Sequence, residues 1–466
     1  MLSIELLTMR RWISLVCLIF LVSGFIPSAQ AQSPQWAIAK KNFNLDTAGF
    51  LAPNSVRPGE QVRAFVTCPS GSFKLTAYRM GYYQGITAKP YWSSKSLPCL
   101  KQAPQTINPV THLSESHWQA STQIPTKELQ PGFYLLKITS SHQHQAFMPL
   151  VVRQNDARGR VVLVIPTMTS LAYNTWHGVN AYRGKSGFAD RARIFSFDRP
   201  NDWGYGSGKY LFYVHPLLVT AERLGLNIDY VTDVDVATIP NLLQGARAYV
   251  SAGHDEYWTG QERTAVEQAR SNGTNLLFFG ANVAYWETRL APSPLGPNRE
   301  MILYKSAMED PNKTNPTVRF RDTNRPESAL TGQNYNCYPA TGNFTVSAPK
   351  SFIFEGTHAT SGEQFSGIIG PEVDHFVTPN SFIGRIQVVA KSPVTCGGEK
   401  RSSSSDVVYG VSPSGAGTIS VGTMRWVERG LTGSVPARTR ALVTKFTENL
   451  LIAAASGPIG LRYPVS

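Results

Sequence analysis

The stretch from residue 247 to residue 288 constrains the fold more than any other part of the chain. It contains two short apolar runs, Ala248–Ser251 and Leu276–Phe279, each fit for a buried strand. Between them, the T-x-x-E pattern at Thr259–Glu262 is typical of a capped helix start, and Gly273 stands where that helix should end. A strand, a helix and a strand of this length predict a parallel pair joined by a right-handed crossover.

The same alternation of strands and helices extends on both sides of this stretch. It predicts an α/β domain with a mostly parallel sheet over residues 160–466, interrupted by an irregular, Pro-, Asn- and Ser-rich insertion at about 291–405. The further strands and helices are expected at Val161–Ile165, Pro216–Leu224, Asn227–Val231 and Arg438–Ala455.

Residues 36–155 differ in character, because they hold short alternating apolar runs separated by Pro and Gly. This pattern predicts an immunoglobulin-like β-sandwich in front of the α/β domain. The runs are Gln61–Val66, Lys74–Tyr78, Phe133–Ile138 and Phe147–Val152.

The first 31 residues have the features of a signal peptide. Arg10-Arg11 precedes an apolar run, and Ala29-Gln30-Ala31 is a small-x-small cleavage site. The apolar run is short for a membrane span, which needs roughly 18 or more residues. We therefore expect export to the periplasm or the medium, and no stable membrane span after cleavage.

Four cysteines follow the signal peptide, and in an exported chain an even number suggests disulfides. Four cysteines allow three pairings, of which sequence neighbourhood favours Cys68–Cys99 with Cys337–Cys396. A nucleophilic cysteine is the less favoured interpretation.

Charge and motifs exclude several function classes. The formal net charge is +13, but the basic residues are scattered, so a solvated basic surface is favoured over nucleic-acid binding. The chain has no H-E-x-x-H zinc motif and no G-x-S-x-G nucleophile elbow. The Gly-rich run Gly204–Tyr210 is too short for a phosphate loop and lacks its Ser or Thr.

Polar side chains follow three of the predicted strands, and in such a sheet these strand ends meet at one edge. Tyr173 and Asn174 follow the first strand, His254 and Glu256 the second, and Asn282 the third. Tyrosinate and carboxylate oxygens are hard donors that favour a hard cation, ferric iron above all. From the residues alone, half-buried core tyrosines and a helix cap remain open as alternatives.

Several motifs carry a family resemblance, namely G-H-D-E-Y-W, L-A-Y-N-T-W and G-A-N, with weaker support from two others. They resemble the large (beta) subunit of bacterial N,N-dimethylformamidase from about residue 45 to the C-terminus. The resemblance implies an immunoglobulin-like domain packed on an α/β domain with a glutamine-amidotransferase- or flavodoxin-like outline. The motifs stand at Gly253–Trp258, Leu171–Trp176, Gly280–Asn282, Met80–Tyr83 and Gly370–Asp374.

The resemblance also implies chemistry, because enzymes of this family hydrolyse small N-substituted formamides at a mononuclear iron held by two tyrosines and one glutamate. Carried over by motif, the ligands would be Tyr134, Tyr173 and Glu256. His254 and Asn282 would orient the substrate, and Glu372 would act as an acid or base. The partner implied is a small amide or N-acyl substrate, and a homo-oligomer is left open.

The chain departs from the family in its export signal and in the loop from Arg183 to Tyr213, which argues for a retained metal and an altered substrate. The competing hypothesis is a non-catalytic envelope- or carbohydrate-binding protein on the same scaffold. Its stacking platforms would be Trp176, Trp203, Trp258 and Trp286.

Overall fold

The structure of the protein is a computed structural model that describes residues 34–398 and 400–465. The predicted signal peptide at residues 1–31 lies outside these residues. None of the helices in the described ranges combines the length and the apolarity that crossing a bilayer requires.

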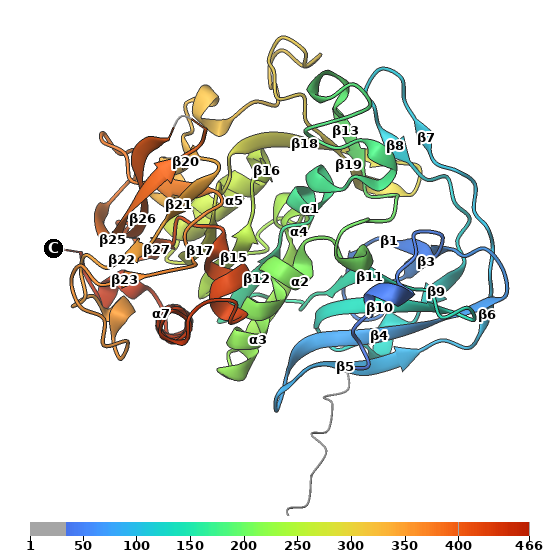
Figure 1. Ribbon diagram of the computed structural model, residues 1–466, viewed down its shortest axis with the longest axis horizontal. Helices are drawn as coiled ribbons and strands as arrows, with labels where there is room; N and C mark the ends of the chain where they lie inside the picture. The colour runs from blue at the N-terminus through green and yellow to red at the C-terminus, as the bar shows by residue number, and fades with distance from the viewer. Residues whose placement is uncertain (1–33, 399, 466) are drawn as a thin grey trace, which may run out of the picture.

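The N-terminal part consists of two sheets that share one core, seen in blue and cyan in Figure 1. The smaller sheet has the order β1-β3-β9 and the larger one β2-β11-β10-β4-β5, with β6 beside β4. All four strands predicted here are present. The bounds are β1 (Ala48–Ala52), β2 (Ser55–Val56), β3 (Val62–Thr67), β4 (Ser72–Tyr83), β5 (Ile86–Ser93), β6 (Leu97–Pro98), β9 (Thr122–Ile124), β10 (Gly132–Ser140) and β11 (Gln145–Val152).

The second part is built on an eight-stranded sheet of order β14-β12-β15-β17-β27-β26-β25-β21. The first five strands are parallel and the last three antiparallel, so the predicted parallel pair, β15 with β17, is confirmed. The bounds are β12 (Val161–Ile165), β14 (Ile228–Thr232), β15 (Ala248–His254), β17 (Asn275–Ala281), β21 (Ala340–Gly342), β25 (Arg385–Cys396), β26 (Arg401–Val411) and β27 (Gly417–Ser420).

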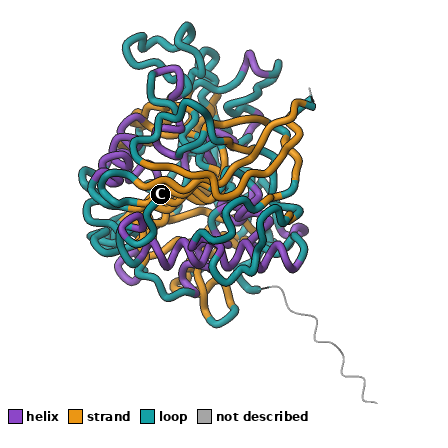
Figure 2. The backbone as a smooth tube through the Cα atoms, turned by 90° about the vertical axis from the view of Figure 1, so that its left-hand side faces the viewer, coloured by secondary structure: helices purple, strands orange, loops and turns teal. Residues whose placement is uncertain are grey.

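Helices cover both faces of this sheet, which Figure 2 shows edge-on as orange strands among purple helices. Successive strand residues point to opposite faces: in β12, Leu163 packs with α3 and α7, whereas Val162 packs with α4 and α5. The bounds are α1 (Thr167–Tyr173), α2 (Tyr210–Tyr213), α3 (His215–Arg223), α4 (Asp233–Thr238), α5 (Gly260–Ser271), α6 (Glu327–Thr331) and α7 (Ala437–Ala455).

The two parts pack against each other through one continuous core. Phe133 and Leu135 of β10 belong to the same buried cluster as Leu163 of β12 and Leu217 of α3. The chain is therefore rich in β structure and built of several sheets around a shared core. The immunoglobulin-like and flavodoxin-like outlines, and the domain boundaries, stay predictions.

The predicted irregular insertion at 291–405 is wrong in part, because it contains β21, β25 and the start of β26, which form the antiparallel end of the main sheet with β21 at the edge. The Ser-rich start of β26 is exposed, so it lacks the apolar pattern of a buried strand. The remaining strands form small sheets: β7 (Thr106–Ile107), β8 (Ser114–Glu115), β13 (Ile194–Ser196), β16 (Tyr257–Thr259), β18 (Trp286–Ser293), β19 (Gly296–Ile302), β20 (Asn334–Cys337), β22 (Phe344–Thr345), β23 (Gln364–Phe365) and β24 (Val373–His375).

Two disulfides join the cysteine pairs that sequence neighbourhood favoured, Cys68–Cys99 and Cys337–Cys396. The first ties the residue after β3 to the residue after β6, and the second links β20 to the end of β25. Each is expected to stabilise the fold by about 2–4 kcal/mol.

Candidate functional site

A pocket of 540 Å³ lies beyond the carboxyl ends of β12, β15 and β17. This is the edge of a parallel sheet where ligands commonly bind. Its walls are polar near the strand ends and aromatic elsewhere. The lining residues are Tyr173, Tyr182, Trp203, Lys209, His254, Glu256, Asn282, Tyr285, Trp286, Tyr335, Tyr338, Pro371, Glu372 and Met424.

Two glycines let the strand ends approach closely enough to form this pocket. Gly280 of β17 pairs with Gly253 of β15, and a Cβ on Gly280 would clash with the carbonyl oxygen of Gly253. Gly253 itself has a φ of 72°, a left-handed conformation that glycine adopts without steric cost. The sequence at these positions therefore fixes where His254 and Asn282 leave the sheet.

Tyrosine and glutamate oxygens converge at the base of the pocket. The hydroxyl of Tyr173 donates to Oε2 of Glu256 at 2.7 Å, and that of Tyr182 donates to Oε1 at 2.8 Å. The two phenol oxygens are 3.0 Å apart. Tyr173 ends the short helix α1, and Tyr182 follows nine residues later. Three oxygen donors from separate segments thus face one point.

His254 is buried beside this cluster. Its Nε2 lies 3.2 Å from the Tyr173 hydroxyl and 3.2 Å from Oε2 of Glu256. Its Nδ1 lies 3.4 Å from the carbonyl oxygen of Ala281. Because a carbonyl can only accept, this contact places a hydrogen on Nδ1 and leaves Nε2 to face the oxygen cluster.

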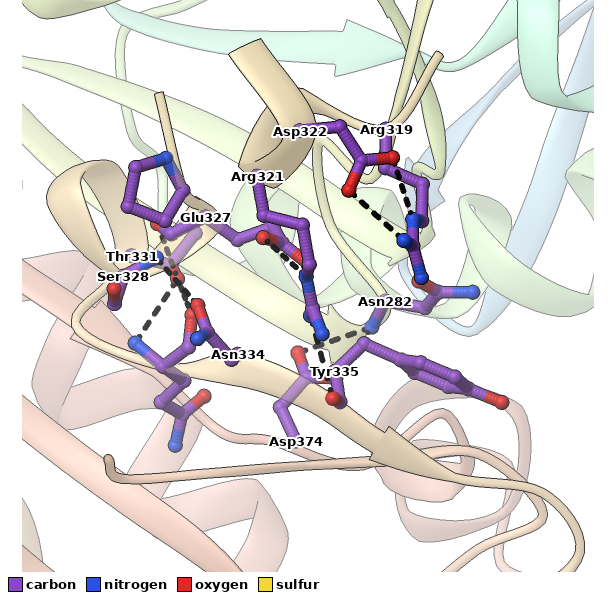
Figure 3. A network of polar contacts seen from close by, with 12 residues as sticks. Asn282, Arg319, Arg321, Asp322, Glu327, Ser328, Thr331, Asn334, Tyr335 and Asp374 are labelled. Atoms are coloured by element: carbon purple, nitrogen blue, oxygen red, sulfur yellow. Dashed lines mark hydrogen bonds and ion pairs between the residues drawn. The ribbon is translucent and has the colours of Figure 1, made fainter. Parts of the chain in front are cut away.

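Asn282 and Glu372 form the opposite wall. The Nδ2 of Asn282 donates to Oε2 of Glu372 at 2.8 Å, and its backbone N–H donates to both carboxylate oxygens of Asp374 at 2.8 and 3.0 Å. Figure 3 shows Asp374 beneath the Asn282 turn, beside Arg321. Asp374 therefore positions the turn in which Asn282 has a φ of 58°.

Two lysines lie on the faces of the converging tyrosines. The Nζ of Lys209 is 3.9 Å from the ring centre of Tyr173, and that of Lys305 is 3.7 Å from the ring centre of Tyr182. Lys305 also donates to the hydroxyl of Tyr257 at 3.0 Å. Only Lys209 of the two lines the pocket.

The titration behaviour of the site follows from burial and from these neighbours. Burial and the Glu256 carboxylate raise the pKa of Tyr173, and they raise that of Tyr182 as well. Burial alone would raise the pKa of Glu256, but the hydrogen bond and charge of His254 lower it. For His254, the Glu372 and Glu256 charges outweigh burial and raise the pKa. Glu256 is therefore the anion of the cluster.

Of the six side chains predicted from the sequence, five line this one pocket: Tyr173, His254, Glu256, Asn282 and Glu372. The sixth, Tyr134, does not reach it. The hydroxyl of Tyr134 donates to the Gln130 carbonyl at 2.7 Å inside the sandwich. The prediction that Tyr134 is a ligand in this pocket is thus wrong. Alternate residues of β10 face opposite ways, and Phe133, not Tyr134, points toward the α/β part of the chain.

Sequence reasoning missed Tyr182, which stands where Tyr134 was expected. Its only signal was a second tyrosine shortly after the L-A-Y-N motif, directly before the glycine- and aromatic-rich loop. The side chain of Asn180 accepts from the backbone N–H groups of Tyr182 and Arg183 and so forms a turn. This turn directs the Tyr182 hydroxyl toward Glu256.

A comparison with known protein families finds one match. A family model described as "N,N-dimethylformamidase beta subunit-like, C-terminal" matches residues 74–434. The chain belongs to this family. The matched range includes every side chain that lines the pocket. No curated protein matches the chain.

The donor set of this N,N-dimethylformamidase-like site fits a small hard cation. The two phenols and Glu256 are 2.7–3.0 Å apart, and neighbouring ligands at about 2.0–2.1 Å from one octahedral ion would be roughly 3 Å apart. Because burial raises the pKa of both phenols, their ionised forms need a positive charge at that point. No cluster of three or more His, Cys, Asp and Glu suited to a metal occurs in residues 34–398 and 400–465.

The predicted stacking tryptophans divide into two groups. Trp203 and Trp286 line the pocket, together with Tyr285, Tyr335 and Tyr338. Trp258 is fully buried under the sheet edge, and Trp176 lines a different cavity. The pocket of this N,N-dimethylformamidase-like protein therefore keeps aromatic walls above its polar base.

Proposed function

We propose that the protein is an exported, metal-dependent hydrolase that cleaves an amide C–N bond at a mononuclear iron. The ligands are Tyr173, Tyr182 and Glu256. The observation that carries this proposal is the convergence of two phenol oxygens on the two oxygens of Glu256 at the base of the pocket. The family name points to the same reaction, because a dimethylformamidase hydrolyses an amide.

The chain's own residues supply the rest of the reaction. Iron, when bound, supplies Lewis-acid polarisation of the amide carbonyl. Glu372 takes a proton from the attacking water and returns it to the departing amine nitrogen as the C–N bond breaks. Asn282 holds Oε2 of Glu372 and leaves Oε1 for this exchange. His254, protonated on Nε2 as well as on Nδ1, stabilises the ionised Glu256 and Tyr173 from Nε2.

Export is supported by the two disulfides, because disulfides form and persist in oxidising compartments. The predicted signal peptide agrees with this compartment.

The proposed reaction is tested with the purified chain reconstituted with iron. We expect about one iron per chain and release of the free amine from N-substituted formamides or related amides, measured by amine derivatisation. A chain that binds iron but releases no amine from a panel of formyl, acetyl and longer acyl amides would contradict the hydrolase assignment.

Replacing Glu372 by Gln should lower kcat roughly 10²- to 10⁴-fold, the usual contribution of a general acid or base. Burial and the Glu256 charge raise the pKa of Glu372 above that of an ordinary glutamate, although His254 opposes this. Since the base form is the carboxylate, wild-type activity should fall as the pH decreases through this raised pKa. Rates measured across a range of pH test this acid-side fall in activity, which the Glu372→Gln variant should no longer show.

The variant should retain its iron, because Glu372 is not among the proposed ligands. Glu363→Gln, which removes a surface carboxylate paired with Arg438, is the matched control and should leave kcat unchanged. Equal kcat for Glu372→Gln and wild type would remove Glu372 from the reaction.

The aromatic walls also support the non-catalytic alternative, a binding protein in which Trp203 and Trp286 stack on a carbohydrate. That function requires neither Glu372 nor a metal. Glycan binding that is unaffected by iron removal, in a chain without amidase activity, would favour it.

A further inference from the structure

A half-buried lysine in the pocket has no ionic partner of its own. The Nζ of Lys209 is enclosed by three aromatic rings, 3.9 Å from the centre of Tyr173, 5.1 Å from that of Trp203 and 5.6 Å from that of Tyr213. Among the described residues it forms neither an ion pair nor a hydrogen bond, and only distant carboxylate charges act on it. Its side chain is part of the pocket wall.

Three carboxylates act on Lys209 through their charge, but each interacts with other side chains. Glu256 accepts from Tyr173 and Tyr182, Glu372 accepts from Asn282, and the charge of Glu428 acts on Tyr213. Each attracts Lys209 through space without contacting it. A half-buried ammonium has three donors to satisfy, and an unpaired one is costly. The N–H donors of Lys209 are therefore available to an acceptor on a molecule that enters the pocket.

The turn that positions Lys209 requires glycine at three places. Lys209 ends the Gly204–Lys209 turn, in which Gly204, Gly206 and Gly208 all have positive φ values of 55°, 98° and 69°. A Cβ on Gly206 would clash with the backbone of Phe147, and one on Gly208 with the side chain of Ser170. This turn is the glycine-rich run that the sequence showed to be no phosphate loop. Its conformation delivers one lysine to the pocket.

Lys305 provides an internal comparison. It lies on the face of Tyr182 as Lys209 lies on that of Tyr173, but it donates to Tyr257 and does not line the pocket. Its contacts with Tyr182 and Tyr257 therefore explain the position of Lys305 within the protein. For Lys209, stacking on Tyr173 leaves the N–H donors of the ammonium group without an acceptor.

From these observations we infer that Lys209 binds a carboxylate of the substrate, so that the substrate is an amide whose acyl or amine part carries a carboxylate, as in an N-acyl amino acid. This rests on the proposed function for the reaction but not for the binding. A single ammonium matches a monoanion better than a phosphate dianion. A pocket of 540 Å³ with aromatic walls also has room for more than a dialkyl formamide.

The test is equilibrium binding of a matched pair, N-formylglycine and N-formylglycinamide, which differ only in the carboxylate. We measure both by titration calorimetry on the full chain, with and without iron. We expect N-formylglycine to bind roughly 10- to 100-fold more tightly, as for a hydrogen bond to a charged group. Lys209→Met should remove this preference, and Lys209→Arg should keep most of it.

Lys305→Met is the matched control, because it removes an equally stacked cation that does not line the pocket. It should preserve the ratio of the two affinities, whatever it does to each of them. Equal binding of the pair by the wild-type chain would overturn the inference, as would an unchanged preference in Lys209→Met. Melting curves establish that the variants fold, and the wild-type ratio tests the inference without any variant.

The two proposals fail separately. If the chain takes up iron and hydrolyses amides but binds the pair equally, the substrate inference is wrong and the proposed function stands. If it prefers N-formylglycine through Lys209 but hydrolyses none of the amides in the panel, the carboxylate site stands and the hydrolase assignment is wrong.

Discussion

Replacing Glu256 by Gln should remove the iron and lower amide hydrolysis by about 10³-fold or more. The reason is that Glu256 supplies the permanent negative charge of the cluster, on which Tyr173 and Tyr182 both converge. A Lewis acid contributes several kcal/mol to such reactions, and each 1.4 kcal/mol is about tenfold in rate. Metal analysis after dialysis and steady-state kinetics check the two effects together.

The substitution should leave the fold intact. Gln has the size of Glu, and the backbone N–H of residue 256 still donates to Thr169. Glu287→Gln is the control, since Glu287 is also a buried carboxylate in this region but does not line the pocket. It should keep both iron and activity. A Glu256→Gln chain that retains stoichiometric iron would show that this carboxylate is not a ligand.

Replacing Gly280 by Ala should destabilise the protein by about 3 kcal/mol or more, near the upper end for overpacking. The added methyl would meet the carbonyl oxygen of Gly253 in the neighbouring strand. Gly253 cannot retreat, because it packs against Tyr213 on its other side. Strands β15 and β17 must then separate where His254 and Asn282 leave them, so activity should fall as well.

Urea unfolding measures the loss of stability. Gly398→Ala is the control, since no atom lies within 4 Å of a Cβ there, and it should change stability by less than about 0.5 kcal/mol. A loss below about 1 kcal/mol for Gly280→Ala would mean that the two strand ends are not held together as closely as described.

The parallel sheet could be predicted from the sequence because its buried strands are continuous apolar runs. The residues of β12, β15 and β17 leave little choice of structure, and they place His254, Glu256 and Asn282 at one edge without knowledge of long-range contacts. These apolar runs therefore predict the central sheet and the position of three of the site residues, His254, Glu256 and Asn282.

The second ligand tyrosine could not be assigned in the same way. The family resemblance supplied Tyr134, but the alternation of β10 turns its side chain into the sandwich. Tyr182 is brought to Glu256 by an irregular turn around Asn180, which has no periodicity to detect. The capped helix start at Thr259 is confirmed, because its hydroxyl accepts from the backbone N–H of Glu262. The Glu262 carboxylate, however, accepts from the Tyr249 hydroxyl rather than from the helix start.

The most direct test of the central claim is the visible spectrum of the iron-loaded chain in Tyr182→Phe and Tyr134→Phe, compared with wild type. Ferric iron held by tyrosinates should give a tyrosinate-to-iron charge-transfer band in the wild type. We predict that Tyr182→Phe weakens and shifts this band or loses the iron, and that Tyr134→Phe leaves band and iron content unchanged. An unaltered band in Tyr182→Phe, or its loss in Tyr134→Phe, would contradict the account.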